Sequence, residues 1–160
     1  MDMIKGRRQD LSDIISIIFE CKELMKSQGI FQWNEDYPTI DIDDGKCYVM
    51  KHNNRLVGYV SINEEEEGLN RTVCSTNERK SLAIHRLCMR PTFQGKGIAK
   101  TILKFIEEFC DKNDYDCIRL DAYSKNKNVL KLYENFGYKK VGQVFFPGRE
   151  LPFYCYEKYI

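Results

Sequence analysis

The sequence lacks any long hydrophobic run. Its longest nearly apolar run, residues 14–19, is interrupted by Ser16 and is far too short to cross a bilayer. The first residues, 1–8, also lack the apolar stretch of a signal peptide. These two absences predict a cytoplasmic protein that does not enter a membrane.

The cysteines lack the short spacing of a metal site or a disulfide framework. No Cys-x-x-Cys pair occurs, and the seven cysteines form an odd, scattered set. We therefore expect reduced cysteines that pack in the core, and no metal site. The set is Cys21, Cys47, Cys74, Cys88, Cys110, Cys117 and Cys155.

Neither sign of charge dominates the composition. Lysine and arginine together number 25, aspartate and glutamate 24, and the net charge is +1. This balance predicts no general affinity for nucleic acid, so any cationic patch must be local. A length of 160 residues with 42% hydrophobic and 31% charged residues is typical of a globular protein, and we expect a single domain over residues 1–160.

Two phosphate-binding motifs are absent as well. The Walker A motif ends in Gly-Lys-Ser/Thr, whereas Gly97 is followed by Ile98. The dinucleotide-binding fingerprint needs three glycines at a set spacing, and only Gly95 and Gly97 are present. The absence of both motifs counts against a protein that binds a nucleotide with the turn around Lys96.

What the sequence does contain is a strand, a turn and a helix start over residues 81–100. Residues 82–89 are rich in apolar side chains, as in a strand buried on both faces, and Pro91 predicts its end. Gly95, Lys96 and Gly97 follow, and a helical apolar pattern begins at Ile98. Glycine lets a backbone approach a ligand, and free N–H groups at a helix start attract anions. The stretch therefore predicts a ligand that carries phosphate.

Periodicity and turn residues predict the other elements, among them a hairpin around the turn-prone pair Asn53-Asn54. A first helix begins near Asp10, a candidate N-cap, and ends near Gly29. Its predicted core-facing stripe is Leu11, Ile14, Ile15, Ile18 and Phe19. We expect strands over residues 3–8, 47–51, 56–62, 117–122, 139–146 and 153–160, and helices from 98 and from 126. This order predicts an α/β or α+β mixed sheet with helices on both faces.

Two motifs resemble those of the GNAT N-acetyltransferase superfamily. Residues 94–99 read Gln-x-x-Gly-x-Ala after a strand with Leu87-x-Met89, which resembles the loop that receives the pyrophosphate of coenzyme A. Residues 126–138 read Asn-x-x-Val-x-x-Leu-Tyr-Glu-x-Phe-Gly-Tyr, which resembles the family's second motif with Val129 in place of its usual alanine. Ala99 is a permitted variant of the first motif's last glycine.

The resemblance implies a fold and a cofactor. The fold would be a central mixed, mostly antiparallel sheet of about six or seven strands, with a splayed pair of parallel strands forming the acyl-CoA cleft. Acetyl-CoA would lie there, with its pantetheine arm on the backbone of residues 87–89, its pyrophosphate on the amides of residues 94–99, and Asn126 opposite. The implied cofactor-binding residues are Leu87, Cys88, Met89, Gln94, Gly95, Lys96, Gly97, Ile98, Ala99, Lys100 and Asn126.

The same resemblance suggests how the acetyl group moves. Tyr133 occupies the position of the family's proton donor to the CoA thiolate, and the motif favours this role over the alternative of a tyrosine that packs helix against sheet. His85 is a candidate general base, with a core histidine or a chain of waters as alternatives. By strand alternation Cys88 points away from His85, so we expect direct attack of an amine in a ternary complex and not an acetyl-cysteine intermediate. The Met89 N–H is the implied oxyanion donor.

Aromatic residues suggest the acceptor. Phe31, Trp33 and Tyr37 could line its site, although a loop pinned by aromatics is an equal reading. They favour a primary amine on a small apolar molecule or at a peptide N-terminus. An alternative is a non-catalytic, regulatory module that binds acyl-CoA without turnover. We expect no nucleic-acid or membrane partner, and a homodimer is compatible with the sequence.

Overall fold

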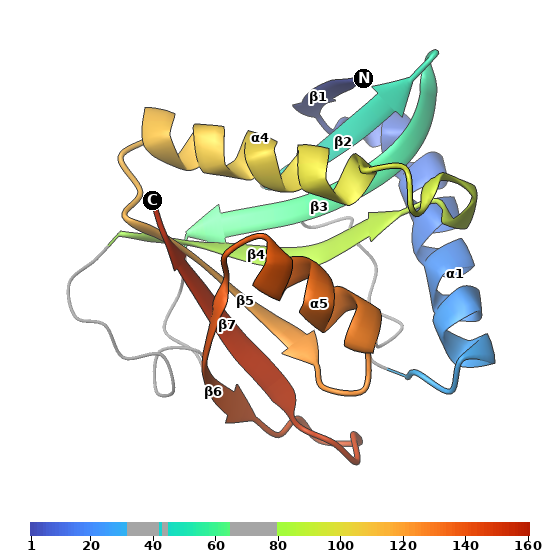
Figure 1. Ribbon diagram of the computed structural model, residues 1–160. Helices are drawn as coiled ribbons and strands as arrows, with labels where there is room; N and C mark the ends of the chain where they lie inside the picture. Colours follow the sequence, from blue (N-terminus) through green and yellow to red (C-terminus); the bar gives the residue numbers. More distant parts are fainter. Residues whose placement is uncertain (32–41, 43–44, 65–79) are drawn as a thin grey trace. The chain divides into compact units, whose positions relative to one another are not determined.

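The computed structural model describes residues 1–31, 42, 45–64 and 80–160 (Figure 1). The predicted helices and strands all form within these residues, with ends that shift by a few positions. Trp33 and Tyr37 lie outside the described residues. The elements in chain order are β1 (Asp2–Lys5), η1 (Arg8–Asp10), α1 (Leu11–Ser27), β2 (Cys47–His52), β3 (Arg55–Glu64), β4 (Ser81–Met89), η2 (Pro91–Phe93), α4 (Ile98–Lys112), β5 (Cys117–Tyr123), α5 (Lys127–Asn135), β6 (Lys139–Val144) and β7 (Phe153–Tyr159).

The strands form a seven-stranded mixed sheet in the order β1-β2-β3-β4-β5-β7-β6. The pairs β1–β2, β2–β3, β5–β7 and β6–β7 are antiparallel, whereas β4 and β5 run parallel. The ladder between the parallel strands covers residues 81–84 of β4, and β4 itself continues to Met89. The mixed, mostly antiparallel sheet confirms the expected fold class.

The chain divides into two compact units, each described by itself. The first comprises residues 1–62 and 85–106, and the second residues 63–84 and 107–160. In the first unit one face of the β2–β3 pair packs on α1. Gly58 on β3 faces α4 instead, because a Cβ at this position would lie 3.0 Å from a methyl group of Ile102. Helices thus cover both faces of this pair, as expected.

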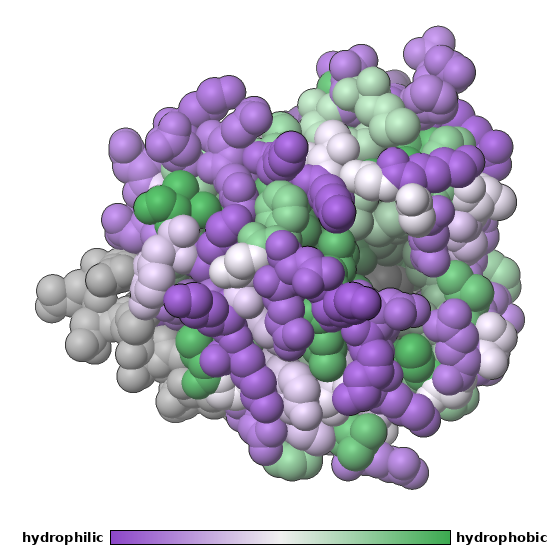
Figure 2. All heavy atoms as spheres, in the orientation of Figure 1, coloured by the Kyte–Doolittle hydropathy of each residue, from purple (hydrophilic) through white to green (hydrophobic). Residues whose placement is uncertain are grey.

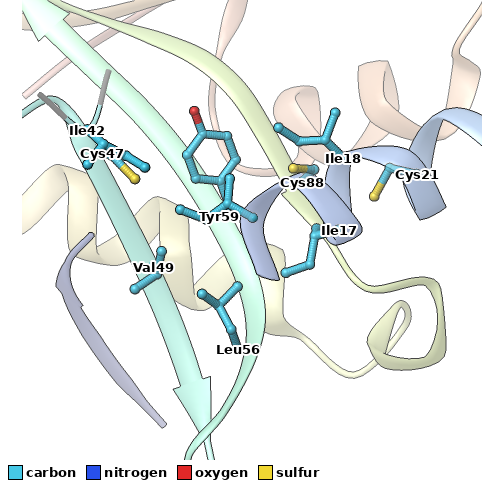
Figure 3. Close-up of a cluster of buried hydrophobic side chains, with 10 residues drawn as sticks. Ile17, Ile18, Cys21, Ile42, Cys47, Val49, Leu56, Tyr59 and Cys88 are labelled. Atoms are coloured by element: carbon cyan, nitrogen blue, oxygen red, sulfur yellow. The ribbon is translucent and has the colours of Figure 1, made fainter. Parts of the chain in front are cut away.

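The buried stripe of α1 differs from the predicted one. Its buried residues are Ile14, Ile17, Ile18 and Cys21, and they pack with Val49, Leu56 and Tyr59 of the hairpin and with Cys88 (Figure 3). The prediction that Phe19 faces the core is wrong, because its side chain is 63% exposed. The i, i+3, i+4, i+7 stripe starts at Ile14, and Phe19 lies about 100° around the helix from Ile18.

Turn residues end the helices and strands at the predicted positions. Asn53 and Asn54 both have positive φ (49° and 59°), which joins β2 to β3 by the tight turn that two left-handed residues favour. Gly29, with φ 72°, follows the end of α1. Asp10 precedes α1 but makes no side-chain cap hydrogen bond. Its carboxylate instead accepts from the backbone N–H of Arg7 and from Lys51 Nζ.

Arg90 is a buried cation at the end of β4 in the first unit. Its side chain is 7% exposed, and Nε donates to the Leu56 carbonyl oxygen at 2.8 Å. Nη1 pairs with Glu20, and Nη2 lies 3.7 Å from an Asp13 carboxylate oxygen. Because its own N–H donates to the Val57 carbonyl, Arg90 joins the end of β4 to both β3 and α1.

In the second unit β5 and β7 share a buried ion pair. Arg119 Nε lies 3.1 Å from Glu157 Oε2, and both side chains are 3% exposed. The two residues face each other in the antiparallel register, so neither charge is buried without its partner. Tyr123 packs on Phe153 at the last pair of this ladder, with ring centroids 5.0 Å apart.

Hydrophilic side chains cover most of the face shown in Figure 2, and hydrophobic ones lie in small separate groups. Among the described residues, no helix combines the length and the apolar character that crossing a bilayer requires. The six described cysteines are buried thiols that form no disulfide with one another.

Replacing Arg90 tests its structural role. We expect Arg90→Met to lower the free energy of unfolding by about 2 kcal/mol, because the buried Leu56 carbonyl loses its side-chain donor while the two carboxylates stay hydrated. Urea denaturation followed by circular dichroism measures the change. Arg55→Met is the matched control on the exposed start of β3, with an expected change below about 0.5 kcal/mol. Equal effects of the two substitutions would contradict the role.

Candidate active site

The turn between β4 and α4 is open and contains two glycines. Gly95 and Gly97 have φ of 76° and 79°, and a Cβ built on either would meet nothing within 4 Å. Left-handed residues in a turn direct successive N–H groups to one side, which makes an anion-binding concavity. The first amides of α4 add to it because they have no acceptor within the helix. The predicted loop residues Gln94 to Lys100 therefore surround one exposed turn in the first unit.

Cationic and aromatic side chains flank this turn. Lys96 and Lys100 are exposed, and Lys96 Nζ lies 5.0 Å from the centre of the Phe93 ring. His52, at the end of β2, meets the edge of the same ring with centroids 6.1 Å apart. His52 thus lies beside the turn. Sequence patterns could not predict this, because His52 precedes Phe93 by about forty residues.

The second half of β4 departs from regular alternation. Arg86 has a positive φ of 42°, which interrupts the pleat between His85 and the residues that follow. His85 is exposed, so it is not the core histidine considered as an alternative. Leu87 and Met89 are half-buried, and Cys88 is buried against α1. Strand parity across Arg86 is therefore no guide to which side chains share a face with His85.

Cys21 of α1 contacts the last residue of β4. Its thiol donates to the Met89 carbonyl oxygen at 3.0 Å. Burial raises the pKa of the Cys88 thiol well above its ordinary value, and the neighbouring Cys21 thiol adds to the effect. A thiol held protonated in this way is a poor nucleophile, because the thiolate is the reactive form.

Tyr133 lies in an aromatic cluster of the second unit. Its side chain is 5% exposed, and its ring centroid is 5.7 Å from that of Tyr138 and 6.2 Å from that of Tyr156. The Tyr138 hydroxyl is buried and has no hydrogen-bond partner in the part of the chain that the structure describes. Tyr133 thus packs helix against sheet, as one of the two alternatives predicted, and this packing does not conflict with a role for its hydroxyl.

Three polar contacts fix α5, the helix that carries Tyr133. At its start the Asn126 side chain accepts a hydrogen bond from the Val129 N–H at 3.4 Å. In its last turn Glu134 accepts from the Tyr156 hydroxyl at 2.8 Å. Just beyond its end, Lys158 Nζ donates to the Phe136 carbonyl at 2.8 Å. Asn126, predicted to contact the cofactor, therefore also caps this helix.

The predicted residues fall into two groups. His85, Leu87 to Met89 and the 94–100 turn belong to the first unit, with Phe31, which is 60% exposed at the end of α1. Tyr133 and Asn126 belong to the second unit. Sequence reasoning missed Cys21 and Arg90. Cys21 contacts Met89, 68 positions away, and the Arg90 side chain contacts Leu56 and Glu20, which are 34 and 70 positions away. The described residues hold no group of three or more His, Cys, Asp or Glu side chains arranged to bind a metal ion.

The comparisons with known proteins agree with the two motifs. Residues 10–138 match the model of the acetyltransferase (GNAT) family. The uncharacterized N-acetyltransferase YesJ of Bacillus subtilis is 23% identical over 142 residues, which cover 84% of this chain and 79% of YesJ. Human N-acetyltransferase 8B is 27% identical over 103 residues, which cover 64% of this chain and 42% of that protein.

Solved structures share the fold. A GNAT-family acetyltransferase from Streptococcus agalactiae superposes with a TM-score of 0.83 at 21% identity, over 99% of this chain and 95% of that one. The acetyltransferase yncA of Salmonella typhimurium, solved with its cofactor acetyl-CoA, has a TM-score of 0.73 at 16% identity, over 99% and 93% of the two chains. Together with the family match and the open glycine turn before α4, these findings identify the chain as a member of the GNAT family, an acetyl-CoA-dependent N-acetyltransferase.

Proposed function

We propose that the protein transfers the acetyl group of acetyl-CoA directly to a primary amine, on a small apolar molecule or at a peptide N-terminus, within a ternary complex. The observation that carries the cofactor's placement is the pair of left-handed glycines, Gly95 and Gly97, before α4. A Cβ built on either glycine would meet open space, so a ligand can approach the backbone there, and the helix start adds its positive end. Lys96 and Lys100 supply local charge on a chain whose net charge is only +1.

The pantetheine arm would pair with the backbone of residues 87–89. The Met89 N–H would then stabilise the oxyanion, and the Tyr133 hydroxyl would protonate the departing thiolate. A phenol has a reference pKa of about 10 and keeps its proton at neutral pH, which suits that role. Asn126 would contact the cofactor from the wall opposite the loop.

Direct attack is favoured over an acetyl-cysteine intermediate. Cys88 is buried in the core, and its raised pKa disfavours the thiolate that such an intermediate needs. His85 is exposed on β4 and can exchange protons with solvent, which supports it as the base that deprotonates the amine. A chain of waters remains the competing assignment.

The proposed acceptor class rests on aromatic side chains near α1. Phe31 is an exposed aromatic side chain at the end of α1, next to the segment that contains Trp33 and Tyr37. A panel of apolar amines, polyamines and short peptides, followed by release of the CoA thiol, tests it. Turnover of polyamines alone would overturn the apolar class, and acetyl-CoA binding without turnover of any acceptor would favour a regulatory module.

Substituting Gly97 tests where the pyrophosphate binds. An alanine Cβ would point into open space, so we expect Gly97→Ala to weaken acetyl-CoA binding about tenfold or more by blocking the anion, as measured by calorimetry. Gly148→Ala is the matched control, because Gly148 has φ 77° and equally open surroundings but lies between β6 and β7. Both carry the same backbone strain, about 1 kcal/mol. Equal affinities of the two variants would contradict the placement.

Removing the hydroxyl of Tyr133 tests its proposed role as the general acid. We expect Tyr133→Phe to lower kcat about 10²-fold with little change in KM for acetyl-CoA, because the thiolate leaves without its proton donor. Tyr138→Phe deletes a neighbouring hydroxyl that lacks a partner among the described residues, so it should keep wild-type kcat and stability. A Tyr133→Phe enzyme that is as fast as wild type would refute the assignment.

The pH–rate profile tests the base. If His85 accepts the proton of the amine, activity of the wild type falls in acid as the imidazole protonates, and His85→Ala abolishes this acidic limb along with most of the rate. His52→Ala is the control for loss of a histidine near the cofactor turn. An unchanged acidic limb in His85→Ala would assign the role to water.

A further inference from the structure

Tyr156 and Glu134 form a hydrogen bond that the proposed chemistry does not use. Tyr156 is fully buried on β7, and its hydroxyl donates to Glu134 Oε1 at 2.8 Å. Burial raises the pKa of Tyr156, and the Glu134 carboxylate raises it further, so the phenol stays protonated and remains a donor. Glu134 directly follows Tyr133 on α5, and the Tyr156 ring lies 6.2 Å from the Tyr133 ring.

A short helix needs such contacts to keep its orientation. α5 has nine residues, and a helix of that length is marginal in water without tertiary contacts. Asn126 caps its start, and Lys158, itself paired with Glu107, holds the carbonyl just beyond its end. Both contacts are made to backbone groups, which lie near the helix axis. They therefore limit sliding of α5 along its axis more than rotation about it.

Rotation about the axis matters most for a long side chain. A turn of about 10° moves a group at the outer radius of a helix by roughly 1 Å. A misplacement of roughly 1 Å can lower a rate about 10²-fold. The Tyr156–Glu134 bond opposes this rotation, because it ties a side chain adjacent to Tyr133 to a buried residue of the sheet.

We propose that Tyr156 is a positioning residue, which fixes the rotation of α5 through Glu134 and so holds the Tyr133 hydroxyl where it can meet the sulfur of coenzyme A. The inference rests on the proposed role of Tyr133 as the acid. It assigns Tyr156 no contact with substrate or cofactor.

The pKa of the thiol of bound CoA gives a readout that needs no acceptor. A hydroxyl that donates to the CoA thiolate stabilises it and lowers the pKa of the thiol. Titration of the thiolate absorbance of CoA bound to the protein measures this pKa, and calorimetry confirms that CoA stays bound. We expect Tyr133→Phe to raise the pKa of the thiol, and Tyr156→Phe to produce a large part of the same rise with unchanged CoA affinity.

Two further variants separate positioning from general damage. Glu134→Ala breaks the same bond from its exposed end and should reproduce the rise seen in Tyr156→Phe. Tyr138→Phe keeps a ring on Tyr133 and should leave the thiol pKa unchanged. A rise in Tyr133→Phe with none in Tyr156→Phe and Glu134→Ala would overturn the inference alone. No rise in Tyr133→Phe itself would overturn the proposed acid instead.

Discussion

The buried guanidinium of Arg90 is the interaction on which the first unit depends. Removing an arginine side chain from water is costly, and the cost is offset only when its donors find well-placed acceptors. Here the acceptors come from a carbonyl of β3 and from carboxylates of α1. Satisfying them fixes where β4 ends, and Pro91 then turns the chain into the glycine turn before α4. The position of the anion site thus follows from a structural cation that precedes it.

Each unit supplies a different part of the expected chemistry. The first holds the open turn and the half-buried end of β4, where Cys21 bonds the Met89 carbonyl. The second holds α5, which is capped at its start, tied to β7 in its last turn and held just beyond its end. Backbone groups carry the proposed binding in the first unit, whereas a side chain carries the proposed proton transfer in the second. The polar contacts of the second unit accordingly gather on the helix that carries Tyr133.

Local signals in the sequence predicted most of the fold. Apolar periodicity gave the helices and strands, and Asn53, Asn54 and Gly29 marked ends that depend on left-handed backbone. The glycine turn was predictable because it is contiguous in the chain. Phe19 was misplaced because two overlapping apolar stripes exist on α1, and only the packing of β2 and β3 decides between them.

Features that join distant residues could not be predicted in the same way. The Cys21–Met89 bond links residues 68 apart, and neither residue type marks such a contact. The break in side-chain alternation at Arg86 could not be predicted either, because arginine has no preference for positive φ. Strand parity therefore breaks at Arg86 and does not relate His85, which precedes the break, to Cys88, which follows it.

Because Gly58 has no side chain, α4 can pack closely on β3. Any Cβ there would press on Ile102, whose methyl group would lie only 3.0 Å away. A larger residue at position 58 would lift α4 from β3 and carry its first amides outward with it. The spacing between α4 and β3 therefore sets where the anion binds, and a substitution on β3 can change it without altering any residue of the turn.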